Sequence, residues 1–134
     1  MTKADVKKLI SYWMTLSESD WKAAVHLCAS RSYVQSLFFV HLALEKLLKA
    51  MIVRASSKHA PYGHDLVYLL GKTGLDCPEQ IIDKLRVIGT FNMESRYPDE
   101  NLSFHKKANK IFCDKWIDEG KMVRKWLAQR FDAM

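Results

Sequence analysis

The sequence is most constrained by one stretch, Tyr33–Val53, in which most side chains are apolar and neither glycine nor proline occurs. An apolar stretch of this length without a breaker predicts a helix that is buried nearly all round. Its polar residues His41, Glu45 and Lys49 recur at every fourth position, so they form one polar line along the helix. A chain that buries such a helix has to surround it with other elements that each present an apolar face.

Helical periodicity marks four further segments, at residues 2–28, 64–70, 78–96 and 103–131. Glycine (5) and proline (3) are scarce, and no segment alternates as a half-buried strand would, which argues against an all-β fold. The length of 134 residues suits one domain. We therefore predict an all-α domain over 1–134, an up-and-down bundle of four long helices plus one short helix, with the second helix the most buried.

Local signals indicate where these helices begin and end. Ser32 followed by Gln35 is typical of a capping box at the start of the second helix. Pro98 disfavours a helical conformation for the residue before it, so the fourth helix is expected to end near Arg96. Ser103 is a suitable cap for the last helix, which is expected to run without a break for about 42 Å.

The net charge of +6 is unevenly distributed along the chain. The segment 104–131 contains eight basic residues against three acidic ones. Such an excess is compatible with an anionic partner, whether a nucleotide, RNA or an acidic protein surface. A solvated helix face is the more common reason for a modest basic excess, and charge alone leaves both explanations open.

The cysteines and the apolar segments indicate the compartment. Cys28, Cys77 and Cys113 are odd in number, far apart and form no CxxC motif, which suits buried thiols in a reducing cytoplasm. The N-terminal residues are charged and lack the core of a signal peptide. No apolar run reaches the roughly 20 residues of a membrane span. We expect a cytoplasmic protein without a membrane partner.

Several kinds of chemistry have no support in the sequence. There is no glycine-rich phosphate loop and no recognisable Ser–His–Asp or Cys–His arrangement. His59, His64 and His105 lack the tight spacing of zinc ligands, so we predict neither a metal nor a cofactor. His64 or Asp65 is instead expected to begin the short third helix.

Three motifs occur in order on the predicted helices: "HLALEKLLKA" on the second, "GHDLVYLL" at the start of the third and "SRYPDE" at the end of the fourth. Together they resemble the HEPN domain family (higher eukaryote and prokaryote nucleotide-binding), over Leu16 to Trp126. The resemblance implies a helical bundle, usually a homodimer, often encoded beside a minimal nucleotidyltransferase as a two-component or toxin–antitoxin pair. Some members are metal-independent ribonucleases, and others are linked to nucleotide binding without known catalysis.

The end of the fourth helix separates these two possibilities. In the ribonuclease branch an arginine, often followed by asparagine, precedes a histidine by a short spacing. Here the arginine would be Arg96, but Tyr97 takes the place of the asparagine, and His105 lies beyond eight intervening residues that include Pro98. The stretch instead resembles the branch with an "RYPD" motif, whose function is nearer to nucleotide binding.

Arg96 is the leading candidate for a functional residue. A guanidinium at a helix end can bind a phosphate through two parallel hydrogen bonds. It can equally form an internal ion pair, with Glu45 or Asp20, and both roles are compatible. Tyr97 could stack on a base or pack over the end of the bundle. The candidate ligand-binding residues are Arg96, Tyr97, Asp99, Lys49 and Glu45.

The polar line on the second helix also has two readings. His41 beside Glu45 could exchange protons near neutral pH. A buried helix also needs its polar groups paired, and the spacing of His41, Glu45 and Lys49 allows this locally. The resemblance places Glu45 and Lys49 in an "EK…KA" signature, which favours a structural or dimer role.

From these observations we predict a non-catalytic HEPN-like domain. It would act as a dimeric nucleotide- or nucleic-acid-binding partner of a minimal nucleotidyltransferase. The first alternative is a metal-independent ribonuclease, a toxin that uses Arg96 and His105 as catalytic residues. The second is a helical interaction module without a ligand.

Overall fold

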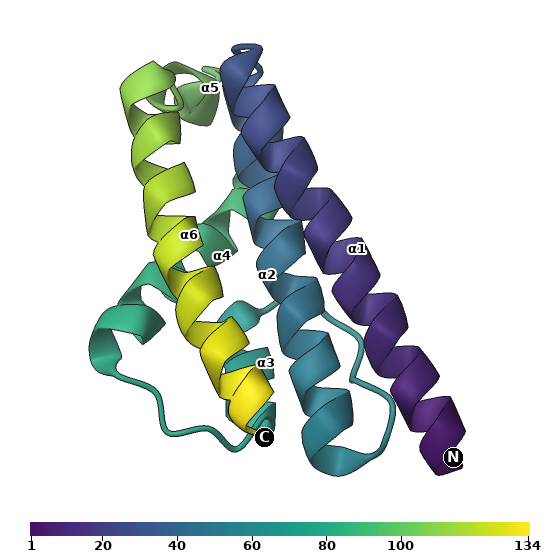
Figure 1. Cartoon of the computed structure of the whole chain (residues 1–134). Helices are drawn as coiled ribbons and strands as arrows, with labels where there is room; N and C mark the ends of the chain where they lie inside the picture. Colours follow the sequence, from purple (N-terminus) through teal and green to yellow (C-terminus); the bar gives the residue numbers. More distant parts are fainter.

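The computed structural model describes all residues 1–134 and contains helices and connecting segments only. Figure 1 shows α1 and α2 as a long antiparallel hairpin, with α6 on the other side of α2 and α4 behind it. The short helices α3 and α5 lie near opposite ends of the bundle (Figure 1). The helices are α1 (Lys3–Ala29), α2 (Tyr33–Ser56), α3 (Leu66–Lys72), α4 (Glu79–Arg96), α5 (Ser103–Lys107) and α6 (Lys110–Ala133). The predicted all-α bundle is confirmed, with six helices instead of five.

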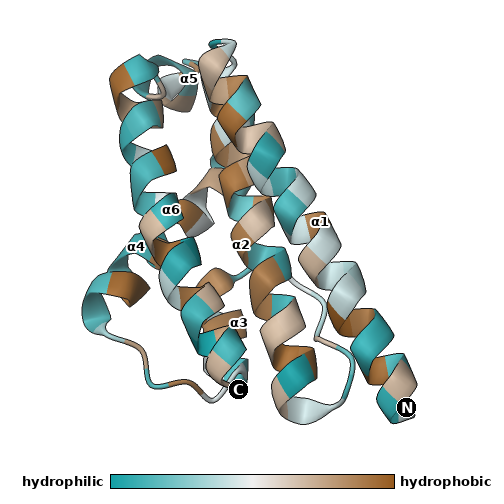
Figure 2. Ribbon diagram, viewed as in Figure 1, coloured by the Kyte–Doolittle hydropathy of each residue, from teal (hydrophilic) through white to brown (hydrophobic).

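The helix α2 forms the centre of the core. It contacts each of the other five helices, and fifteen of its residues are buried, more than in any other helix. Its burial on all sides, predicted from the apolar stretch, is therefore confirmed. In Figure 2 the visible surface of α6 is largely hydrophilic, whereas that of α1 mixes hydrophilic and apolar residues. No helix carries an apolar segment long enough to span a bilayer.

The turn between α1 and α2 is tight and differs from the prediction. Arg31 has a left-handed backbone (φ 67°), and the amide of Ser32 donates to the carbonyl of Leu27 at 2.8 Å. Ser32 precedes α2, but its side chain makes no capping hydrogen bond, so the predicted capping box with Gln35 is wrong. An N-cap needs an extended backbone, whereas the ψ angle of Ser32 is 69°.

The predicted last helix is divided in two. The five-residue α5 ends at Lys107, and α6 begins at Lys110 with Asn109 as its N-cap, whose side-chain oxygen accepts from the amide of Phe112 at 2.9 Å. Ser103 does not cap this region: the carboxylate of Asp99 accepts from the Ser103 amide at 2.8 Å. The prediction failed because an asparagine that favours capping was assigned to the interior of a helix.

Two other helix ends follow their local signals. The side chain of Asp65 accepts from the amides of Val67 and Tyr68, both at 3.1 Å, and so caps α3. The helix α4 ends at Arg96, two residues before Pro98, as predicted.

Aromatic side chains join α4, α5 and α6 at the end of the bundle that also holds Arg96. The ring centroid of Phe91 lies 5.7 Å from that of Phe104 and 5.8 Å from that of Trp116. All three residues are buried. This aromatic contact fixes the end of α4 against the two following helices.

Candidate functional site

A buried carboxylate, Glu45, is the centre of the main polar cluster inside the bundle. Its Oε1 lies 3.2 Å from Nε2 of His41 and 2.7 Å from Nδ1 of His64, and its Oε2 accepts from Nζ of Lys49 at 3.3 Å. His41 and Lys49 lie one turn on either side of Glu45 on α2, whereas His64 comes from the segment that precedes α3. The predicted polar line therefore exists, and one residue from a distant part of the chain joins it.

The surroundings of Glu45 keep it ionised. Burial raises the pKa of its carboxyl, but the hydrogen bonds from His41 and His64 and the charge of Lys49 outweigh burial and lower this pKa to about 2. The Lys49 ammonium also lies 5.2 Å from the ring centroid of Trp13. Because the side chains of Glu45 and Lys49 are only 5% and 8% exposed and bond to each other, the cluster favours their structural role over direct contact with a ligand.

Asp20, the other acid that could pair with Arg96, also has a different partner. Asp20 forms an ion pair with Lys46, which joins α1 to α2 beside the Glu45 cluster. Arg96 forms an ion pair with neither Asp20 nor Glu45, so the predicted internal ion pair is wrong. Lys49 is itself buried.

The position of α4 explains why Arg96 and Glu45 do not meet. The hydroxyl of Ser95 lies 3.5 Å from the carbonyl oxygen of Val34, so the end of α4 is level with the start of α2. Glu45 lies eleven residues further along α2, about 16 Å away at 1.5 Å per residue. That distance is too great for the side chain of Arg96 to span.

Arg96 and Tyr97 instead form an exposed pair at the end of α4. The guanidinium carbon lies 5.6 Å from the centroid of the Tyr97 ring, and Tyr97 is 63% exposed. Arg96 makes no hydrogen bond or ion pair with another side chain. The pair therefore offers a free guanidinium and an accessible aromatic ring at one point on the surface.

Asp99 and His105, which follow Arg96 and Tyr97 in the sequence, have different surroundings. The carboxylate of Asp99 accepts a hydrogen bond from the Ser103 amide and so holds the start of α5 in place. This hydrogen bond lowers the pKa of the Asp99 carboxyl. His105 is exposed on α5 and forms no hydrogen bond or ion pair with Arg96. The structure thus brings Arg96 together with Tyr97, and Glu45 with Lys49, but it does not join these two pairs.

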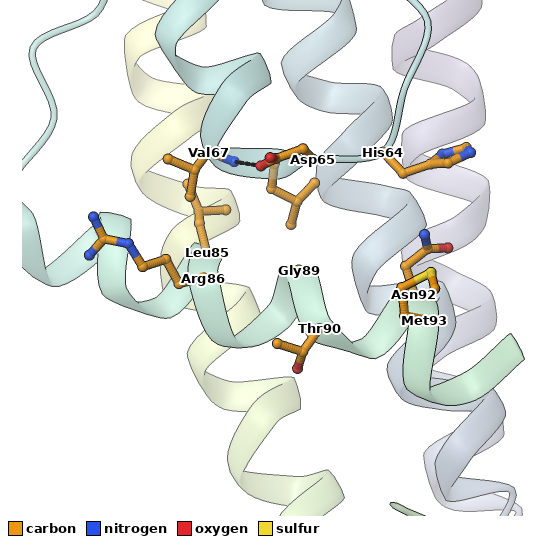
Figure 3. Close-up of a pocket in the computed structure, with 10 residues that line it drawn as sticks. His64, Asp65, Val67, Leu85, Arg86, Gly89, Thr90, Asn92 and Met93 are labelled. Atoms are coloured by element: carbon orange, nitrogen blue, oxygen red, sulfur yellow. Dashed lines mark hydrogen bonds between the residues drawn. The ribbon is translucent and has the colours of Figure 1, made fainter. Parts of the chain in front are cut away.

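A cavity of about 480 Å³ lies between the start of α3 and the middle of α4 (Figure 3). Gly89 leaves its α4 side open, because a methyl group added there would meet no atom within 4 Å. Asn92 also lines the cavity, and its buried Oδ1 has no hydrogen-bond partner. Arg86 extends away from the cavity in Figure 3 and pairs with Glu79 and Asp83.

Sequence reasoning missed the contact of His64 with Glu45. These residues are nineteen positions apart, and nothing in their local sequence indicates that they meet. The only usable signal was that Glu45 is an acid on a buried helix and therefore needs several partners.

No group of three or more histidine, cysteine, aspartate or glutamate side chains is arranged to hold a metal ion.

The helical architecture is similar to that of two proteins of known structure. The protein TT1696 from Thermus thermophilus has a similar structure, with a TM-score of 0.76 and 15% sequence identity over 90% of this chain and 96% of that chain. ST0689, described as an archaeal HEPN homologue, has a TM-score of 0.70 and 18% identity over 91% of this chain and 97% of that chain. At these identities the likeness concerns the fold alone. A comparison with curated proteins finds no match.

The fold defines a class: a single helical bundle of the kind found in HEPN homologues. The sequence itself matches the family model of the HEPN domain over residues 10–130. The chain therefore belongs to the HEPN domain family.

Proposed function

We propose that this HEPN domain is non-catalytic and binds a phosphate-bearing ligand, a nucleotide or RNA, at the exposed end of α4. The proposal rests on Arg96, whose guanidinium is free of carboxylates and lies against the ring of Tyr97. A free guanidinium binds phosphate oxygens in a bidentate manner. The exposed Tyr97 ring supplies a surface on which a base can stack.

Further positive charge lies near this end of the molecule. The short α5 carries Lys106 and Lys107, and neither forms an ion pair. Of the three acids in this stretch, Asp99 already accepts the hydrogen bond of the Ser103 amide, whereas Glu94 and Glu100 are exposed. The two lysines at the end of α5 add positive charge that favours an anionic ligand at Arg96.

We further infer that the domain acts as a homodimer and pairs with a minimal nucleotidyltransferase in a two-component system. Family membership makes such a pairing the first to test. The dimer is supported by apolar side chains that remain exposed on α4 and the turn after it. Val87 is 38% exposed, Met93 59% and Leu102 46%. A second copy that covered these side chains would remove them from water.

The binding role is tested by titrating a fluorescein-labelled oligoadenylate, and separately ATP, with the parent protein and with Arg96→Ala. Loss of a charge-assisted phosphate contact should weaken binding by roughly tenfold or more. Arg130→Ala is the matched control, because Arg130 lies 5.0 Å over the ring of Trp126 in the same kind of arrangement on α6. Equal affinity for parent and Arg96→Ala, with the fold intact, would remove the proposed role.

The pairing has its own test. The product of the neighbouring reading frame, if it is a nucleotidyltransferase, should form a complex with this chain when the two are produced together. Size-exclusion chromatography with light scattering would give the composition of that complex. Two separate peaks for the two proteins would contradict the pairing and leave the binding role of Arg96 untouched.

A further inference from the structure

A groove runs between α1 and α6 at the end of the bundle opposite to Arg96. The two helices come together at Gly120, where an added methyl group would lie 3.3 Å from the ring of Trp21. From that point they diverge toward the start of α1 and the end of α6, and α2 forms the floor between them (Figure 1). Two cavities of about 610 and 360 Å³ lie along this groove and share Met14 in their linings.

The groove has the length of a short helix. Its lining begins near Lys3 and reaches Glu18 on α1, which is about 22 Å at 1.5 Å per residue. The ion pair between Glu18 and Arg124 crosses it near its narrow end. An occupant that fills both cavities is therefore elongated, about four helical turns long.

The lining combines an apolar floor with a cationic rim. The apolar side chains are contributed by all three helices: Val6, Ile10 and Met14 on α1, Leu47 on α2 and Phe131 on α6. The rim has five cations without an ion pair: Lys3, Lys7, Arg54, Lys121 and Lys125. Glu18 is the one acid in either lining, and Arg124 already neutralises it.

The placement of Lys3 is unfavourable for α1 itself. It occupies the first residue of the helix, where the positive end of the helix dipole repels a cation. It has no carboxylate partner to offset that repulsion, since Asp5 bonds to Thr2. An unpaired cation at this end of α1 is unfavourable for the helix itself, which points to a role for Lys3 outside the helix. An anionic partner in the groove would give Lys3 the opposite charge that it lacks.

The chemistry of the lining favours a protein over a nucleic acid. Bases bind to exposed aromatic faces, but the two rings near the ends of this groove, Phe131 and Trp21, are only 9% and 8% exposed. Arg54 lies 4.4 Å over the ring of Phe131, and Arg124 lies 5.3 Å over that of Trp21. The remaining floor is aliphatic and thioether surface, which suits leucine-like side chains at helical spacing.

A second copy of this chain does not fit the rim. The chain carries a net charge of +6, so another copy would bring further positive charge toward five unpaired cations. The occupant has to be acidic as well as apolar.

We propose that the groove between α1 and α6 docks an acidic amphipathic helix of a partner protein. The apolar face of that helix packs on Val6, Ile10 and Met14, and its flanking carboxylates face the lysines of the rim. This site lies away from Arg96 and does not depend on phosphate binding there. Nothing in the proposal requires the partner to be a nucleotidyltransferase.

The probe is a fluorescein-labelled synthetic helix of about 16 residues, with leucines at positions i, i+3, i+4 and i+7 and glutamates on the flanks. Anisotropy titration should show saturable binding that weakens with salt. Two control peptides keep the composition in shuffled order or replace each glutamate by lysine, and neither should bind. Lys3→Glu combined with Lys7→Glu should weaken the probe at least about tenfold.

The matched control is Lys22→Glu combined with Lys58→Glu, which makes the same charge change at exposed lysines outside both cavities and should leave affinity unchanged. Val6→Ser, at a half-buried site outside the main core cluster, should weaken the probe about fivefold by removing apolar contact. Thermal melting followed by circular dichroism checks that each variant is folded.

Three outcomes would overturn the proposal. The first is the absence of saturable binding by the acidic helix. The second is equal binding of the shuffled peptide, which would reduce the effect to bulk charge. The third is a labelled oligoadenylate that displaces the probe and loses affinity in the same Lys3 and Lys7 variant, which would make the groove a nucleic-acid site.

Discussion

Nδ1 of His64 lies 2.7 Å from Oε1 of Glu45 and joins the segment before α3 to the middle of α2. The side chain of His64 is 51% exposed, whereas that of Glu45 is 5% exposed. The contact therefore links a carboxylate in the core to a group that solvent can reach. With His41 and Lys49, it gives this carboxylate three partners on its two oxygens.

The ionised Glu45 should make the free energy of unfolding depend on pH in acid. Its pKa is about 2 in the folded chain and 4.5 in the absence of the fold, so the unfolded chain binds the extra proton between these values. Its stabilisation is complete above about pH 4.5 and is lost as the pH falls toward 2. The slope from this one group reaches about 1.4 kcal/mol per pH unit.

The variant Glu45→Gln tests this dependence by urea unfolding at several pH values from 2 to 7. It should lose most of that slope between pH 2 and 4.5. It should also be less stable near neutral pH by a few kcal/mol, because Lys49 becomes a buried cation without a partner. An unchanged slope in the variant would assign the acid sensitivity to other carboxylates.

Substitutions at two helical glycines should change the free energy of unfolding in opposite directions. A side chain on Gly120 would meet Val40 Cγ1 at 3.0 Å and Trp21 at 3.3 Å, so Gly120→Leu should destabilise the fold by about 1–3 kcal/mol through overpacking. Gly89 lies within α4 beside open space, so Gly89→Ala should stabilise by about 0.5–1 kcal/mol through helix propensity. Chemical denaturation measures both, and equal effects would mean that α1 and α6 do not approach at Gly120.

The centre of the fold could be predicted from sequence because one physical requirement decides it. An apolar stretch as long as Tyr33–Val53 has to be buried, and α2 is the most buried helix. Helix ends set by a short-range steric or capping rule were also predictable, as at Asp65 and at Arg96 before Pro98. These rules need only neighbouring residues.

The polar contacts between helices could not be predicted in the same way. Both Asp20 and Glu45 were plausible partners for Arg96, yet Lys46 pairs with Asp20, and His64 joins Lys49 on Glu45. Such a choice depends on which turns lie level in space, and the offset of about 16 Å between the end of α4 and Glu45 is not encoded locally. The boundary between α5 and α6 was missed for a different reason. Asn109, a residue that favours the N-cap position, marked the start of α6. The helical spacing of the apolar residues on either side of it predicted one continuous helix instead.

The oligomeric state is the next testable expectation. We expect light scattering to give twice the chain mass of 15.6 kDa. Met93→Glu places a charge on the exposed apolar surface of α4 and should convert the dimer to a folded monomer. Met122→Glu is the control, at a similarly exposed methionine on α6. A parent protein that stays monomeric at all concentrations would contradict the expectation.

The last prediction concerns Arg96 and His105 as a ribonuclease pair. Cleavage of RNA without a metal needs a base near the 2′-hydroxyl and a cation near the phosphate, both within reach of one substrate. His105 lies on α5, beyond the turn that contains Pro98, and forms no hydrogen bond with Arg96. The purified protein should therefore leave labelled RNA intact in EDTA, and His105→Ala should behave like the parent while both bind it. Cleavage by the parent that disappears in His105→Ala would show that the two residues do meet on the substrate, within one chain or across a dimer.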